Sequence, residues 1–151
     1  MARVALDTGV IVEYVDRAGP YHAQALLVFT TALSGKLELV IPHPVLAETY
    51  YVAARIYEKL GLDDPRGRAA RLVSWLYRRP SVKVAEADLR LALEAGAAKI
   101  KYGLALTDCY VLAAAKIYKC KPLFRKREKE MEGIEEQLKR DYGILFLEDY
   151  A

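Results

Sequence analysis

The sequence contains no asparagine and only two glutamines, whereas charged residues make up 28% of its 151 residues. Few amide side chains beside many charged ones favour a thermophilic source. Cysteine is also scarce, with only Cys109 and Cys120. On one helix they would lie about 16 Å apart, which is too far for a disulfide. We therefore expect free thiols and an intracellular, cytoplasmic protein.

Long apolar runs are missing as well. No stretch approaches the ~20 apolar residues that a membrane-spanning helix needs, so we expect no membrane partner. The N-terminal stretch MARVALDTGVIVEYVD contains acidic residues and lacks the apolar region and cleavage site of a signal peptide. Neither a Gly-rich phosphate loop nor a G-x-S-x-G motif occurs, which argues against P-loop enzymes and serine hydrolases.

The residues that are abundant indicate a folded protein. Hydrophobic residues make up 54% of the sequence, and this length suits a single domain, residues 1–151, with a substantial core. The formal net charge of +3 is compatible with a nucleic-acid partner but does not require one.

Short apolar runs alternate with longer helical patterns along the whole chain. Strands are expected at residues 3–6, 37–41, 82–84, 122–124 and 144–147. Helices are expected at residues 8–16, 21–34, 44–60, 64–79, 85–101, 107–119 and 127–140. This alternation predicts an α/β fold with a mostly parallel sheet covered by helices on both faces. Ligands of such sheets bind beyond the carboxyl ends of the strands.

Three carboxylates fall near that edge of the expected sheet. Asp7 directly follows the first strand, Glu48 lies one turn into the helix after the second, and Asp108 lies in the first turn of an apolar helix. Grouped carboxylates repel one another unless a cation neutralises them, and oxygen ligands suit Mg²⁺ or Mn²⁺. Such a site can activate water for phosphodiester hydrolysis.

Each of these acids also has a structural alternative. Asp7 could cap the helix that begins at Thr8, and Glu48 could face solvent. Asp108 could be a favourable charge at the positive end of its helix, with Thr107 as the cap. Thr8 and Thr107 could instead hydrogen-bond a neighbouring carboxylate or a water in the metal site.

Three stretches in this order, LDTGVIVEYVD, LAETYYVA and ALTDCYVLAAA, resemble the PIN domain family. The similarity is closest to the VapC-type toxins of prokaryotic toxin–antitoxin pairs. The resemblance implies a three-layer α/β/α sandwich and an endoribonuclease that depends on Mg²⁺ or Mn²⁺. It also implies an RNA substrate, a small antitoxin partner and a homodimer. Asp7, Glu48 and Asp108 match the first three acids of the family's metal site.

The fourth acid of the family departs from the pattern in this chain. The family commonly has T-x-D after the fourth strand, but Arg125 stands at the threonine position and Arg127 near the aspartate. Glu128 is the nearest replacement for a fourth metal ligand, and Glu130 is the next. The basic run of Arg125, Lys126 and Arg127 could contact RNA phosphates. Alternatively, it belongs to a solvated, salt-bridged helix face.

Two further groups of residues could contact partners or simply pack in the core. One is a basic strip beside aromatic residues, which would suit single-stranded RNA: Arg66, Arg68, Arg71, Arg78 and Arg79. The other is a set of helix tyrosines that would suit a protein interface: Tyr50, Tyr51, Tyr57 and Tyr77.

Two other functions remain open from the sequence. The first is a non-catalytic PIN-like module that binds RNA or protein, which the departure at the fourth acid favours. The second is a metal-dependent phosphatase. Gly9, two positions after Asp7, argues against the phosphoaspartate kind, which needs D-x-D.

Overall fold

Five parallel strands form the central sheet of this computed structural model, which describes residues 1–151. The strands are β1 (Ala2–Leu6), β2 (Leu37–Pro42), β3 (Val82–Ala85), β4 (Lys121–Phe124) and β5 (Leu145–Phe146). Their order across the sheet is β3-β2-β1-β4-β5, and every neighbouring pair runs parallel. The predicted parallel sheet is therefore confirmed.

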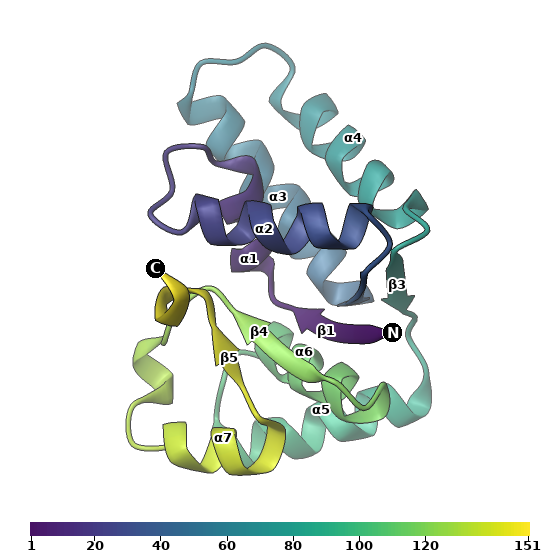
Figure 1. Ribbon diagram of the computed structural model, residues 1–151, viewed down its shortest axis with the longest axis vertical. Coiled ribbons are helices and arrows are strands. Elements are labelled where there is room, and N and C mark those ends of the chain that lie inside the picture. The colour runs from purple at the N-terminus through teal and green to yellow at the C-terminus, as the bar shows by residue number, and fades with distance from the viewer.

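Helices cover both faces of this sheet, so the expected three-layer α/β/α sandwich is also confirmed. Figure 1 shows α1 to α4 on one side of the sheet and α5 to α7 on the other. The helices are α1 (Thr8–Val15), α2 (His22–Leu33), α3 (His43–Lys59), α4 (Pro65–Arg78), α5 (Leu89–Tyr102), α6 (Leu106–Ile117) and α7 (Glu135–Tyr142). Two 3-10 turns complete the fold, η1 (Lys129–Met131) and η2 (Leu147–Tyr150). None of these helices combines the length and the apolarity needed to cross a membrane.

The direction in which the chain crosses the sheet reverses at β1. From β1 the chain adds β2 and then β3 on one side, and α5 and α6 then carry it back to β4 on the other side. The backbone N–H of Asp7 donates to the carbonyl of Leu123 at 3.2 Å, which closes β1 against β4. Open α/β sheets bind their ligands at such a reversal, beyond the carboxyl ends of the strands.

The core explains why α6 is almost wholly apolar. Residues 111–115 of α6 are all buried, because this helix packs directly against β1, β2 and β4. On the opposite face, the rings of Tyr14 and Phe29 stack at 4.1 Å between centroids. Cys109 and Cys120 are both free thiols, as predicted.

Helices α3 and α4 pack against each other as a hairpin, and we call residues 43–78 the α3–α4 arm. Figure 1 shows the far end of this arm extending away from the sheet. Helix α4 begins at Pro65, and the side chain of Asp64 caps it by accepting from the N–H of Gly67 at 3.2 Å.

Two helix predictions are wrong in extent. The helix expected at residues 85–101 begins only at Leu89, because Ala85 still pairs in β3 and Asp88 provides the cap. The charged helix expected at residues 127–140 is interrupted: η1 ends at Met131, and α7 starts only at Glu135. Gly133 lies between them with φ +84°, a conformation outside a right-handed helix.

Candidate acidic site

Asp7 lies at the carboxyl end of β1 and begins α1. Its Oδ1 accepts a hydrogen bond from the N–H of Val10 at 3.0 Å, so it is the helix cap that the sequence offered as an alternative. The residue is only 8% exposed. One buried carboxylate therefore caps α1 at the carboxyl end of β1, where the Asp7 backbone bonds to β4.

Burial controls the protonation of Asp7. Loss of hydration raises the pKa of its carboxyl to about 8. The N–H groups of Val10 and Arg125 oppose this rise, whereas the charges of Asp108 and Glu128 add to it. The chain thus holds a carboxyl group that is largely protonated near neutral pH unless a cation compensates its charge.

Asp108 lies in the first turn of α6, half-buried, and the residue at the cap position is Ala105 rather than Thr107. Burial raises the pKa of Asp108 to about 7, and the carboxylates of Glu48, Glu128 and Glu130 raise it further. The same acidic neighbourhood thus combines residues from α3, α6 and the segment after β4. All four acids named from the sequence, Asp7, Glu48, Asp108 and Glu128, act on one another through these two aspartates.

The donor chemistry of this group fits a hard divalent cation, since every side chain offers carboxylate oxygen. The hydroxyl oxygen of Thr8, next to Asp7, is buried and has no hydrogen-bond partner. Buried polar atoms are usually satisfied, so this hydroxyl is free to meet a ligand or a water. No three His, Cys, Asp or Glu side chains are arranged to coordinate a metal ion in this structure.

Sequence reasoning missed the ion pair between Glu13 and Arg125. Glu13 is only 2% exposed; its Oε1 lies 2.6 Å from Nε of Arg125, and its Oε2 accepts from the N–H of Tyr21 at 3.1 Å. Arg125 also lies over the Tyr21 ring, 5.4 Å from its centroid. The signal was a single glutamate within the apolar stretch GVIVEYV.

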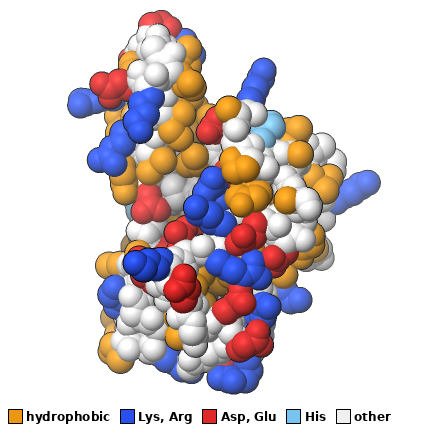
Figure 2. All heavy atoms as spheres, turned by 90° about the vertical axis from the view of Figure 1, so that its left-hand side faces the viewer, with side chains coloured by type: hydrophobic (Ala, Val, Ile, Leu, Met, Phe, Trp, Pro, Cys, Tyr) orange, Lys and Arg blue, Asp and Glu red, His pale blue; other side chains and the backbone are white.

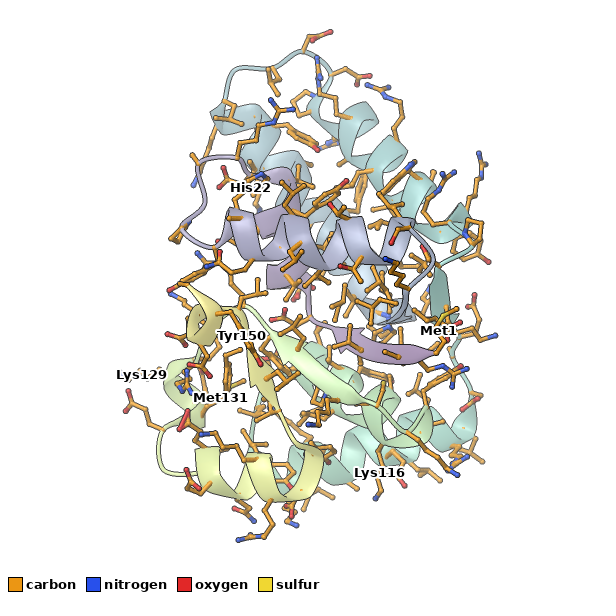
Figure 3. The ribbon with its side chains drawn as sticks, viewed as in Figure 1. Met1, His22, Lys116, Lys129, Met131 and Tyr150 are labelled. Atoms are coloured by element: carbon orange, nitrogen blue, oxygen red, sulfur yellow. The ribbon has the colours of Figure 1, made fainter.

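Arg127 is likewise held by acids of the protein itself. Its guanidinium makes two hydrogen bonds to Asp149, at 2.8 and 3.0 Å, and another to Glu135. Its backbone N–H donates to Glu148 at 2.6 Å. These contacts tie the segment after β4 to η2, and Figure 3 places Lys129, Met131 and Tyr150 on the same side of the molecule, at the left of the view.

The basic run predicted to contact phosphates is therefore largely committed to other contacts. Arg125 and Arg127 are both paired with carboxylates, and Lys126 alone is exposed without an ion pair. Figure 2 shows the result on this face, where acidic and basic side chains mix in a band below the α3–α4 arm.

Comparison with known proteins matches one sequence family and several solved structures. The sequence model of the PIN domain matches residues 4–136. A toxin–antitoxin complex from Klebsiella pneumoniae matches with a TM-score of 0.62 and 18% identity, covering 95% of this chain and 97% of that one. VapC20 of Mycobacterium tuberculosis, described as a toxin that cleaves the sarcin–ricin loop, matches with a TM-score of 0.64 and 14% identity, covering 83% and 89%.

A third similar structure is VapBC-1 of nontypeable Haemophilus influenzae, with a TM-score of 0.57 and 17% identity, covering 97% of this chain and 98% of that one. At such identities the likeness establishes a shared fold. No curated protein matches this chain in sequence.

Proposed function

The chain belongs to the PIN domain family, and from that premise we propose that it is a divalent-metal-dependent endoribonuclease, the toxin of a toxin–antitoxin pair. The observation that carries the proposal is the group of interacting acids at the carboxyl edge of the sheet, Asp7, Glu48, Asp108 and Glu128. Burial and mutual repulsion raise the pKa of Asp7 to about 8 and that of Asp108 to about 7. Such a costly arrangement is typical of a functional site.

Asp7 and Asp108 would be the main ligands of Mg²⁺ or Mn²⁺, with Glu128 as a further ligand. The bound ion would supply Lewis-acid chemistry, lowering the pKa of water and stabilising charge on the phosphoryl group. Deprotonated Asp7 and Asp108 would supply the negative charge that holds the cation. The hydroxyl of Thr8 would hydrogen-bond a carboxylate or a water beside it.

Glu48 approaches the same space from α3, where it would either ligate the cation or orient the attacking water and accept its proton. Attack of this water at phosphorus breaks the bond to the 3′-oxygen, which leaves with a proton. The expected products therefore carry 5′-phosphate and 3′-hydroxyl ends.

The partners follow from the same proposal. Two of the similar structures are described as a toxin–antitoxin complex and as VapBC-1, which supports a small antitoxin protein for this chain too. We also propose that the chain is one domain, forms a homodimer and acts in the cytoplasm.

The second candidate is a PIN-like module that binds RNA or protein without cleaving it. Arg125 and Arg127 occupy the region of the family's fourth acid, and no three acids are arranged to coordinate a metal ion. Metal binding separates the two candidates directly.

The deciding experiment combines Mn²⁺ titration calorimetry with cleavage of a labelled single-stranded RNA. We expect wild type to bind Mn²⁺ and cleave, Asp108→Asn to bind at least tenfold more weakly, and Asp7→Asn not to cleave. Asp88→Asn is the matched control, since Asp88 also caps a helix but is exposed. Absence of Mn²⁺ binding by wild type at millimolar metal would favour the non-catalytic module.

A further inference from the structure

An RNA-cleaving site built of carboxylates needs cations nearby to hold the phosphates of its substrate. The guanidinium groups closest in sequence to that site cannot fill this role freely. Arg125 is paired with Glu13, and Arg127 faces Glu135, Glu148 and Asp149. Lys126 is the one member of this basic run that is exposed without an ion pair, so further charges that guide RNA must come from another part of the surface.

The α3–α4 arm provides a cleft with suitable residues. The cleft has a volume of about 620 Å³ and is lined by α3 and by the start of α4. Tyr50 and Tyr51 reach it with 37% and 45% of their surface exposed. The guanidinium carbon of Arg55 lies 4.9 Å from the centroid of the Tyr51 ring. Figure 2 shows hydrophobic and basic side chains together on this arm.

The cations of this cleft differ from their neighbours in being free. Arg55 and Arg66 both line the cleft, and neither forms an ion pair. By contrast, Arg68 pairs with Asp63 at 2.6 Å and Arg71 with Asp64 at 3.7 Å. Proteins bind single-stranded nucleic acid with such groups: unpaired guanidinium groups bind the phosphates, and exposed aromatic rings stack on the bases.

Helix geometry connects the cleft to the acidic group. Along α3, Tyr51 and Arg55 lie about 4.5 and 10 Å beyond Glu48, at 1.5 Å per residue. Seven residues are close to two turns, so Arg55 lies on nearly the same side of α3 as Glu48. An RNA strand whose scissile phosphate lies beside Glu48 would therefore contact Tyr51 and Arg55 next.

We infer that Tyr50, Tyr51, Arg55 and Arg66 form a subsite for the nucleotides of single-stranded RNA that flank the cleaved bond. The inference rests on the proposed function in taking RNA as the substrate. Tyr51 stacks on a base, and the two arginines meet phosphates. Glu58 and Asp64 also line the cleft, and both carboxylates repel phosphate. Glu58 accepts a hydrogen bond from a ribose 2′-hydroxyl, a donor that DNA lacks.

The test measures binding of fluorescein-labelled octauridylate by anisotropy, with EDTA present so that no cleavage occurs. Loss of one stacked base weakens binding by about 1–3 kcal/mol, so we expect Tyr51→Ala to raise Kd about 5- to 150-fold and Tyr51→Phe to leave it within about twofold. Arg55→Gln should also reduce the salt dependence by about one phosphate contact. Tyr77→Ala is the control, an exposed tyrosine outside the cleft.

Two further measurements test whether the cleft distinguishes RNA from DNA. Octadeoxyuridylate should bind more weakly than octauridylate, and Glu58→Gln should narrow that difference. Unchanged octauridylate binding by folded Tyr51→Ala would overturn the subsite and assign the cleft to a protein partner. Cleavage of RNA with Mn²⁺ is measured separately. If wild type binds octauridylate through Tyr51 but does not cleave RNA, the proposed nuclease activity is refuted and the RNA-binding cleft stands. If wild type and Tyr51→Ala cleave RNA at the same rate, the subsite is refuted and the nuclease activity stands.

Discussion

Nε of Arg125 lies 2.6 Å from Oε1 of Glu13, and this ion pair joins the residue after β4 to the last turn of α1. Both side chains are largely removed from water, with 27% and 3% of their surfaces exposed. A charge left alone in such a place is costly, because neither solvent nor a partner compensates it. The pair therefore holds the two segments that border Asp7 in a fixed relation.

Arg125→Met should reveal this cost. The substitution leaves the Glu13 carboxylate buried opposite an apolar side chain, and we expect the free energy of unfolding to fall by about 3 kcal/mol. Urea denaturation at pH 7 measures it. Arg68→Met, which breaks the more exposed pair with Asp63, should cost less than about 1 kcal/mol. Equal decreases in the free energy of unfolding of the two variants would show that the buried Glu13–Arg125 pair stabilises the protein no more than an exposed pair does.

Gly9 and Gly96 should respond to alanine in opposite directions. Both lie inside helices, where alanine is intrinsically favoured by about 1 kcal/mol. A Cβ on Gly96 meets open space, so Gly96→Ala should raise the melting temperature. A Cβ on Gly9 would lie 2.7 Å from Cβ of Arg125, so Gly9→Ala should destabilise the protein by about 1–3 kcal/mol. Thermal melts followed by circular dichroism compare them, and a stabilised Gly9→Ala would contradict the close packing.

Stability of the metal-free protein should fall as pH rises from about 4 to about 8. The ordinary pKa of Asp7, 3.8, applies to the unfolded chain, whereas burial raises it to about 8 in the folded protein. Below pH 4 both states hold the proton; between these values only the folded state does, so ionisation favours unfolding by up to about 1.4 kcal/mol per pH unit.

Urea denaturation at pH 4.5, 6 and 7.5 in EDTA tests this dependence. Asp7→Asn should remove about half of the slope up to pH 7 and most of it above, because Asp108, with its pKa of about 7, contributes a comparable share only below that pH. Asp88→Asn should keep the wild-type slope, because Asp88 caps α5 through the same kind of bond, to the N–H of Leu91, from an exposed position. If the free energy of unfolding of wild type did not change with pH over this range, the raised pKa of the buried Asp7 carboxyl would be refuted.

Arg127→Met should loosen the segment that carries Glu128. The variant removes the links from Arg127 to Glu135 and Asp149, and Glu148 loses the guanidinium that lies 3.3 Å from it. We expect backbone amides of residues 127–128 and 148–150 to exchange hydrogen at least tenfold faster, as mass spectrometry of peptides would detect. Lys139→Met, which removes only contacts at 3.9 Å, should leave these rates unchanged.

The strands were predictable because each is a short apolar run bounded by turn residues, and all five were located to within about two residues. The parallel-sheet rule also led from Asp7, Glu48 and Asp108 to one neighbourhood. Asp7 follows β1, Glu48 lies in the helix after β2, and Asp108 begins the helix that leads into β4, so all three lie at the carboxyl edge of the sheet. Their roles as metal ligands remain a prediction of the sequence.

Other features depend on contacts that no local pattern records. Glu13 and Arg125 are separated by 112 positions, so their pairing exists only after β4 lies beside β1. The interrupted helix at residues 127–140 has a similar cause. Arg127 and Glu135 carry helix-compatible charges, but tertiary ion pairs with Glu148 and Asp149 hold this stretch in another path.

The strand order has a consequence for the chain while it is being synthesised. Strand β1 is made first and can soon pair with β2, but its other neighbour, β4, leaves the ribosome only after Phe124. Until then β1 lacks its neighbour on the β4 side, and the acidic group at Asp7 lacks Arg125 and Glu128. The proposed RNA-cleaving site is therefore incomplete until most of the chain has been translated.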